Sequence, residues 1–201
     1  MTRFGYVMAT YCAAMGVAVA AIVPVPVKLL WNASASKSLG LYDLTAPNEL
    51  RAGDLVAVRP PKPLADFMVR RGYIGQGVPL LKPVAALPGK LVCRAGRTVT
   101  VDGVRLGEAQ ERDRRGRVLP IWQGCRRIAP DQIFLMNPSV RDSLDGRYFG
   151  PLPRATVIGR ATPLYTDALG DGHFVWHGLL ADRPMPFLPN IATETFHAAD
   201  R

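Results

Sequence analysis

Short runs of β-branched and other apolar residues recur along the chain after residue 50, separated by glycine and proline. The runs cover residues 54–58, 91–93, 98–101, 133–136 and 156–158. Runs of this length between turn residues are typical of β-strands. Asp102-Gly103 follows the third run and is a favoured two-residue turn, so we predict a hairpin from Thr98 to Arg105.

Helical patterns are scarce after the N-terminal segment, and residues 65–73 are the one modest candidate. Eighteen prolines and nineteen glycines are spread through 201 residues, which disfavours long helices. We therefore predict a mainly β domain over residues 31–165, preceded by a distinct segment at residues 1–30. Residues 166–201 contain Pro184, Pro186 and Pro189 and have a polar end, so we expect a loosely packed C-terminal tail.

The first thirty residues form an apolar segment with no charged residue between Arg3 and Lys28. A helix of this length, at roughly 1.5 Å per residue, exceeds the ~30 Å hydrocarbon core of a bilayer. Pro24 and Pro26 would end or bend it. A cleaved secretory signal is the alternative, but its apolar stretch is normally only about 7–15 residues, so a retained membrane anchor is favoured. The flanking charges are too balanced to set its orientation.

The net charge of +9 comes largely from arginine clusters at residues 70–71, 112–117 and 126–127. Beside a membrane anchor, such charge suits an anionic lipid surface, but solvated loops are the simpler and favoured explanation. Nucleic-acid binding is disfavoured, because the clusters lack interleaved aromatic residues and a known binding motif. Of the three cysteines, Cys12 lies in the apolar segment. Cys93 and Cys125 lie beyond it and either pair in an oxidising compartment or remain buried thiols.

Three segments carry candidate chemistry. Residues 32–42 follow the apolar segment directly and contain Ser36, but a serine hydroxyl is a weak nucleophile without a base, and such a stretch is often a linker. Lys82 is the single cation in the apolar run 78–87. Burial there would lower its pKa and leave part of it neutral, whereas a lysine on an edge strand would reach solvent and stay charged.

The third segment, residues 137–150, is polar and rich in turn residues after a buried strand. A serine hydroxyl in it could accept a hydrogen bond from the Lys82 amine, and an aspartate could fix the local geometry or pair with Arg147. Taken alone, the segment is better explained as a turn in which Asp142 and Asp145 accept backbone hydrogen bonds.

Together and in order, these segments resemble the signal peptidase family, most closely the TraF-type peptidases of conjugative transfer. The resemblance implies a small signal-peptidase-like β-barrel or sheet domain preceded by one transmembrane helix, and it runs from about Asn32 to Pro163. The matching segments are residues 36–42, 53–56, 81–89, 134–137, 142–150 and 157–161.

The resemblance also implies roles for individual residues. Ser36 would attack the scissile carbonyl, Lys82 would act as general base and then general acid, and Asp145 would be the third functional residue. Ser143 matches the serine that orients the lysine, and Ser34 matches the residue whose hydroxyl helps to form the oxyanion hole. We expect the Ser36 hydroxyl within about 2.6–3.2 Å of the Lys82 amine. Cys93 and Cys125 resemble a pair that recurs in the TraF-type group.

The sequence departs from the family pattern at four positions. Ser38 stands for a proline, Pro83 for an arginine, Lys90 for an aspartate and Gly146 for a serine. Lys37 also places a second cation beside Ser36. We favour Lys82 as the base, because adjacent residues on an extended strand point to opposite faces.

The sequence thus predicts a serine endopeptidase of the bacterial inner membrane, with its catalytic domain in the periplasm and no cofactor or metal. Its expected partners are the lipid bilayer and a membrane-embedded, pilin-like precursor, with no nucleic acid; the resemblance adds possible cyclisation of the pilin. The alternatives are a catalytically silent subunit of a pilus assembly apparatus, a soluble Ser–Lys autoprotease, and a metal site at His173 and His177, four residues apart but without a clear third ligand.

Overall fold

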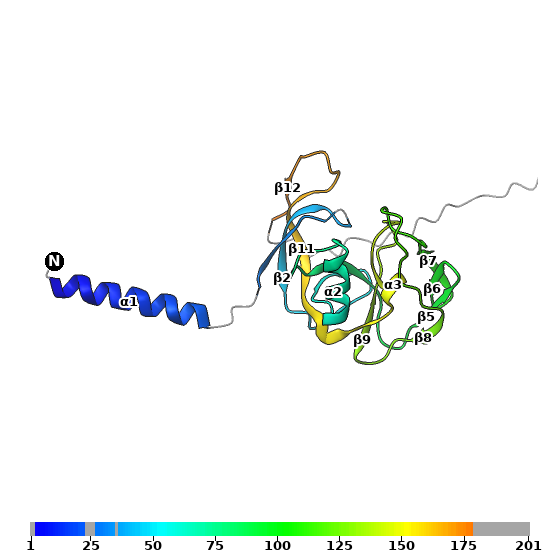
Figure 1. The fold of residues 1–201 in the computed structure, drawn as a ribbon, viewed down its shortest axis with the longest axis horizontal. Helices are drawn as coiled ribbons and strands as arrows, with labels where there is room; N and C mark the ends of the chain where they lie inside the picture. Colours follow the sequence, from blue (N-terminus) through cyan, green and yellow to red (C-terminus); the bar gives the residue numbers. More distant parts are fainter. Residues whose placement is uncertain (1–2, 23–26, 35, 179–201) are drawn as a thin grey trace, which may run out of the picture.

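The computed structural model describes residues 3–22, 27–34 and 36–178, and its fold is mainly β, as predicted (Figure 1). The N-terminal helix α1 covers Arg3–Ile22. Within the described residues, none of the helices combines the length and the apolar character that a membrane crossing requires. Residues 179–201, which make up most of the predicted C-terminal tail, lie outside the described residues.

The larger sheet has eight antiparallel strands in the order β1-β2-β11-β3-β4-β9-β10, with β12 paired to β11. Its strands are β1 (Leu29–Asn32), β2 (Leu39–Thr45), β3 (Leu55–Val58), β4 (Leu80–Ala86), β9 (Gln132–Leu135), β10 (Leu152–Pro153), β11 (Val157–Asp167) and β12 (Val175–Trp176). The run at 156–158 therefore opens a much longer strand, which extends past the expected start of the tail at residue 166.

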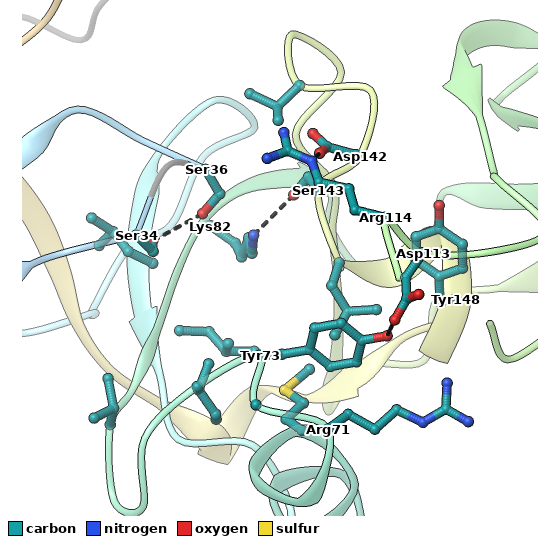
Figure 2. Close-up of a pocket in the computed structure, with 18 of the residues that line it drawn as sticks. Ser34, Ser36, Arg71, Tyr73, Lys82, Asp113, Arg114, Asp142, Ser143 and Tyr148 are labelled. Atoms are coloured by element: carbon teal, nitrogen blue, oxygen red, sulfur yellow. Dashed lines mark hydrogen bonds and ion pairs between the residues drawn. The ribbon is translucent and has the colours of Figure 1, made fainter. Parts of the chain in front are cut away.

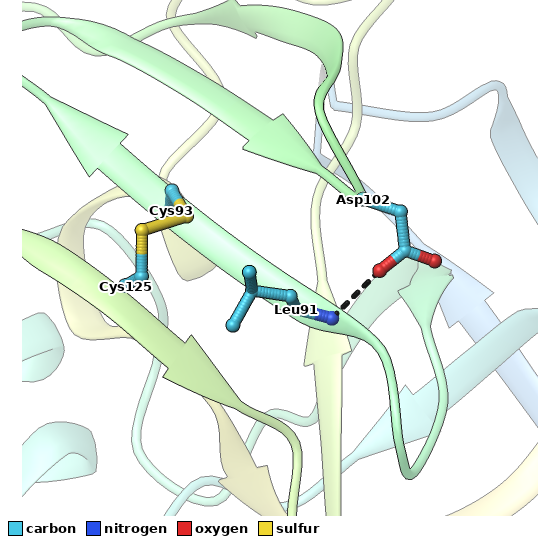
Figure 3. The surroundings of a disulfide bond; sticks show 4 residues. All are labelled: Leu91, Cys93, Asp102 and Cys125. Carbon is cyan, nitrogen blue, oxygen red and sulfur yellow. Dashed lines mark hydrogen bonds between the residues drawn. A yellow bond between two sulfur atoms is a disulfide. The ribbon is translucent and has the colours of Figure 1, made fainter.

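The smaller sheet has four antiparallel strands in the order β7-β6-β5-β8. They are β5 (Leu91–Ala95), β6 (Thr98–Val101), β7 (Val104–Glu108) and β8 (Gly124–Arg127). The predicted hairpin is confirmed: β6 and β7 pair across Asp102 and Gly103, whose φ angles of 47° and 81° suit a tight turn. The Asp102 carboxylate also accepts a hydrogen bond from the backbone N–H of Leu91 at 2.8 Å (Figure 3).

A disulfide joins Cys93 of β5 to Cys125 of β8, as the family resemblance implied (Figure 3). The two residues face each other in the strand register, with their Cα atoms 4.0 Å apart. Cys12 of α1 is a free, exposed cysteine. The bond therefore links strands of one sheet that are separated by 32 positions in the sequence.

The longer helix of the β-domain is α2 (Lys62–Arg70). It begins and ends three residues earlier than the helix predicted at residues 65–73. It starts earlier because Pro63 is tolerated in the first turn, where no intrahelical donor is needed. It ends earlier because Gly72, with φ of 68°, turns the chain away. Two short elements follow later, the helix α3 (Gly146–Phe149) and the 3-10 turn η1 (Arg154–Thr156).

The core has three main parts, and β4 and β9 contribute to the two largest. One cluster packs α2 against the larger sheet through Met68, Val58 and Leu135. A second cluster joins the two sheets, with Phe134 and Trp122 in edge-to-face contact 6.5 Å apart. The third cluster contains Tyr42, Leu44, Ala57, Leu81 and Ala161. Lys82 therefore lies on a strand that is covered by apolar residues.

Candidate active site

A pocket of about 1030 Å³ opens beside β4 and brings together chain segments that are far apart in sequence. Its walls come from the loop after β1, the end of α2, β4, the loop after β7 and the loop after β9. Four of the five predicted oxyanion and catalytic positions line it: Ser34, Ser36, Lys82 and Ser143 (Figure 2). Asp145, the fifth, does not line the pocket and is fully buried.

Lys82 occupies the middle of β4 and pairs with Val56 of β3. Its side chain is only 4% exposed, so it does not reach solvent as a lysine on an edge strand would. The pKa of Lys82 is lowered to about 8, and burial is the largest cause. The negative charges of Asp145 and Asp142 raise it, and the positive charges of Arg147 and Lys37 lower it. The Lys82 amine donates to Ser143 Oγ at 2.9 Å, which matches the orienting role expected of Ser143.

Asn32, at the end of β1, organises the loop that carries Ser36. Its buried amide donates to the carbonyl oxygens of Ser34, Lys37 and Ser38 at 3.0 to 3.1 Å. Its Oδ1 accepts from both the backbone N–H and the hydroxyl of Ser34. One side chain thus closes the loop around the nucleophile candidate.

The hydroxyl of Ser36 lies 3.2 Å from that of Ser34. Because a hydroxyl has one proton and Ser34 gives its own to Asn32, Ser36 is the donor in this pair. Among the described residues, no hydrogen bond joins Ser36 Oγ to Lys82 Nζ, so the expected direct contact is not formed. Figure 2 shows both side chains in the same part of the pocket. The physical reason for the difference is that Ser34 offers a nearer acceptor, and rotation about χ1 would redirect the Ser36 hydroxyl.

Asn137 ties the Ser36 loop to the end of β9, a contact that the sequence did not reveal. Its side-chain amide donates to the carbonyl oxygen of Ser36 at 2.6 Å. In the sequence, Asn137 ends the family-like segment 134–137 and begins the polar segment 137–150, but nothing there indicated a contact with Ser36. Asn137 is 2% exposed, so the donor of this hydrogen bond is buried, whereas Ser36 is partly exposed.

Asp145 and Arg147 form a buried ion pair behind the pocket, with Arg147 Nε 2.8 Å from Asp145 Oδ1. The carboxylate accepts from the backbone N–H of Asn137 at 3.0 Å, and Arg147 donates to the Asn137 carbonyl at 2.6 Å. The pair therefore fixes both polar groups of the Asn137 backbone. In this arrangement Asp145 acts on Ser36 through Asn137 and on Lys82 through its charge.

The second cation near the nucleophile, Lys37, does not line the pocket. Burial lowers its pKa as well, and its backbone carbonyl accepts from Asn32. Its effect on the site is electrostatic, because its charge depresses the pKa of Lys82.

The two histidines considered as metal ligands have other contacts. His177 Nε2 lies 2.9 Å from Thr166 Oγ1, and His173 Nδ1 lies 3.4 Å from Asp171. Within the part of the chain that the structure describes, no cluster of three or more candidate metal ligands is found.

Two of the departures from the family pattern have a structural explanation. A Cβ atom added at Gly146 would come within 2.7 Å of the Phe134 ring, so this position has no room for a serine. Lys90 forms an exposed ion pair with Asp102 at 2.8 Å, next to the β6–β7 turn. Nothing in the structure explains Pro83 or Ser38.

Comparison with known proteins finds a matching family model and a solved structure with limited similarity. The sequence model of the family described as "Signal peptidase, peptidase S26" matches residues 1–166. A crystal structure of a signal peptidase I from Enterococcus faecalis V583 aligns with a TM-score of 0.36 and 21% identity, over 58% of this chain and all of that one.

Three curated relatives are similar in sequence. "Conjugal transfer protein TraF" of Agrobacterium fabrum is 34% identical over 67% of this chain and 81% of its own length. "Probable conjugal transfer protein TraF" of Sinorhizobium fredii is 37% identical, over 68% and 77%. "Plasmid transfer protein TraF" of Escherichia coli is 31% identical, over 71% and 78%.

Proposed function

Since this chain belongs to the signal peptidase family, peptidase S26, we propose that it is a membrane-anchored serine endopeptidase in which Ser36 is the nucleophile and Lys82 the base. The observation that carries this proposal is the buried amine of Lys82. With a pKa of about 8, about one in ten of these amines is neutral at pH 7, compared with fewer than one in a thousand for an exposed lysine. A neutral amine can accept the serine proton.

The reaction proceeds in two halves. Ser36 Oγ turns from Ser34 toward Lys82, transfers its proton to Nζ and bonds to the scissile carbonyl carbon. The protonated Lys82 then gives that proton to the leaving amine as the peptide C–N bond breaks, which leaves an acyl ester on Ser36. In the second half a water molecule, activated by Lys82, attacks the ester and frees the enzyme.

The remaining site residues hold this pair in place. Ser143 accepts a hydrogen bond from the Lys82 amine and directs its lone pair once the amine is neutral. Ser34 would supply an oxyanion donor by turning its proton from Asn32 Oδ1 toward the substrate. Asp145 and Arg147 keep Asn137, and through it Ser36, in position.

The substrate we propose is a secreted or pilin-like precursor processed during conjugative transfer. The names of the TraF relatives support a role in conjugation. Attack on the acyl ester by the amino terminus of the same pilin, in place of water, would release a cyclic product. Both outcomes use the same acyl-enzyme.

We place the enzyme at the bacterial inner membrane, with its β-domain in the periplasm. The uncharged stretch between Arg3 and Lys28 supports the membrane anchor. The Cys93–Cys125 disulfide supports an oxidising compartment for the β-domain. The Ser36 loop follows this segment closely, which suits a substrate that is itself embedded in the membrane.

A catalytically silent assembly subunit is the second candidate. The observation in its favour is that Ser36 hydrogen-bonds to Ser34 and not to Lys82 in the described structure. Such a subunit would keep its role in pilus formation without the serine or the lysine.

Co-expression of the chain with candidate pilin precursors distinguishes the active peptidase from the silent assembly subunit. We expect the mature product to appear with the wild-type chain and with the matched control Ser38→Ala, and to be absent with Ser36→Ala and Lys82→Ala. Mass spectrometry measures the mass of the mature product. A mass that is lower than that of the trimmed linear peptide by the mass of one water molecule identifies cyclisation. Pilus formation that survives both Ser36→Ala and Lys82→Ala would support the silent subunit instead.

A further inference from the structure

One end of the catalytic pocket is rich in arginine. Six arginines and two aspartates are among the residues that line it. The arginines are Arg71 at the end of α2, Arg112, Arg114, Arg115 and Arg117 in the loop after β7, and Arg141 in the loop after β9. In Figure 2, Ser34, Ser36 and Lys82 lie on one side of the pocket, and Arg71, Arg114 and Asp113 lie on the other.

Both aspartates are already paired within the protein. Asp113 forms an ion pair with Arg117 at 2.7 Å and accepts a hydrogen bond from the Tyr73 hydroxyl at 2.6 Å, and these contacts hold the pKa of Asp113 well below its usual range. Asp142 forms an ion pair with Arg114. Among the described residues, the other four arginines form no ion pair, so no carboxylate compensates their positive charge at this end of the pocket.

Arg115 and Arg141 are the freest of these cations. Both are exposed at the pocket wall. Within the described residues, neither guanidinium has an ion pair or a side-chain hydrogen bond. Each guanidinium can therefore offer its donors to a ligand, and a planar guanidinium binds a carboxylate through two parallel hydrogen bonds.

The loop that presents most of these arginines is built before any ligand arrives. Asp113 accepts from the backbone N–H groups of Arg115 and Arg117, each at 2.9 Å, and closes the turn. Arg71 donates to the carbonyl of Val118 at 2.7 Å, which ties the loop to the end of α2. A preorganised loop loses little conformational entropy on binding, so its charges contribute more to affinity.

We infer that this arginine-rich end of the pocket is a subsite that binds carboxylate groups of the precursor near the scissile bond. The inference rests on the peptidase function proposed above. An acidic peptide segment is the occupant we favour over an anionic lipid, because the arginines share one cavity with Ser36 and Lys82. The carboxylates belong either to acidic side chains or to the carboxyl terminus of the precursor.

This subsite can be tested by measuring peptide binding to the full chain in detergent. All proteins in the assay carry Ser36→Ala, so that no peptide is cleaved during the measurement. The probes are fluorescein-labelled peptides of alanine and serine: one with glutamates and an amidated end, one with glutamines and an amidated end, and one with glutamines and a free carboxyl terminus. We expect the double variant Arg115→Gln/Arg141→Gln to bind a carboxylate-bearing peptide about tenfold more weakly at low salt. Binding of the amidated glutamine peptide should not change.

The matched control is Arg51→Gln/Arg59→Gln, which removes the same charge from exposed positions outside the pocket. Equal losses in both double variants would attribute the effect to net charge and overturn the subsite. Arg115→Lys/Arg141→Lys should bind more tightly than the glutamine variant, since it keeps the charge while losing the paired donors.

Vesicles of neutral and anionic phospholipid test the competing occupant. If Arg115→Gln/Arg141→Gln loses vesicle binding while its peptide binding is unchanged, the arginines face lipid and the inference fails. Precursor cleavage by the chain with Ser36 intact reports the proposed function separately, so a carboxylate subsite on an inactive protein would be recognised as such. Equal thermal melting of the variants confirms that they are folded.

Discussion

At the scale of single residues, the site depends on what surrounds Lys82. Burial is the largest cause of its lowered pKa, and the opposing charges of Asp145 and Arg147 partly offset each other because they form one ion pair. Removal of either partner would leave a buried charge uncompensated beside the lysine. The ion pair therefore matters both for the geometry of Asn137 and for the protonation of the base.

The first prediction concerns pH. Because the neutral amine is the reactive form and its pKa is about 8, we expect kcat/KM to rise about tenfold per pH unit below 8 and to level off above it. A series of cleavage rates on one precursor from pH 6 to 10 measures this. A rate that is flat from pH 6 to 8 would contradict Lys82 as the base.

The second prediction concerns Asn137, whose amide holds the Ser36 carbonyl. We expect Asn137→Ala to lower kcat by roughly three- to tenfold with little change in KM, as expected for a hydrogen bond worth about 1 kcal/mol that positions the nucleophile. Asn48→Ala, on an exposed loop, is the control. A rise in KM with an unchanged kcat would show that Asn137 serves substrate binding instead.

At the scale of elements, β2 fixes the end of the Ser36 loop between β1 and β11. Gly40 permits β2 to lie between these two strands, because it pairs with Asn32 of β1 on one side and with Thr166 of β11 on the other. Its φ of 136° is rarely adopted by other residues, and an added Cβ would overlap the carbonyl oxygen of Tyr165. The position of Ser36 thus depends on a glycine four residues later in the chain.

The third prediction follows from that contact. We expect Gly40→Ala to destabilise the fold by about 3 kcal/mol or more, because backbone atoms would have to move apart in the larger sheet. Gly96→Ala tests the cost of a positive φ alone, since φ there is 59° and an added Cβ would meet no atom within 4 Å. Thermal or urea unfolding measures both, and equal losses would rule out the steric explanation.

At the scale of the whole molecule, the larger sheet carries Lys82 on β4 and Ser36 in the loop between β1 and β2, while the loops after α2, β7 and β9 complete the pocket. The loop after β7 supplies four of the six arginines, and the disulfide between β5 and β8 links two strands of the smaller sheet, in which that loop begins and ends. Most of the proposed carboxylate subsite and the Ser36–Lys82 pair therefore belong to different parts of the fold.

The fourth prediction concerns the membrane anchor. If the N-terminal segment spans the bilayer, two central charges should weaken its insertion, at a cost of about 2.5–3.5 kcal/mol each. We expect Val17→Arg/Val19→Arg to be released by alkaline carbonate extraction, while the wild-type chain stays in the membrane pellet. Val104→Arg, on the exposed β6–β7 hairpin, is the matched control. Release of the wild-type chain under the same conditions would exclude a spanning helix.

The sequence predicted the mainly β fold and the hairpin at Asp102-Gly103, and the family resemblance pointed to the pairing of Cys93 with Cys125, which the residues themselves left open. Local patterns could predict the hairpin because the conformation of a turn depends on adjacent residues. Strand lengths were harder to predict: β11 runs on to Asp167 because its pairing with β2 continues beyond the apolar run at 156–158. The start of α2 was missed because prolines are tolerated in a first helical turn.

Ser36, Lys82, Ser143 and Asp145 could be selected from the sequence because the family motifs place them in order. Only the tertiary structure decided which groups meet. It buried Lys82, gave it Ser143 as an acceptor and turned Ser36 toward Ser34. It also joined Asn137 to Ser36, across 101 positions of the sequence. The physical reason is that burial and hydrogen bonding between distant segments depend on how the strands pack, which local patterns do not encode.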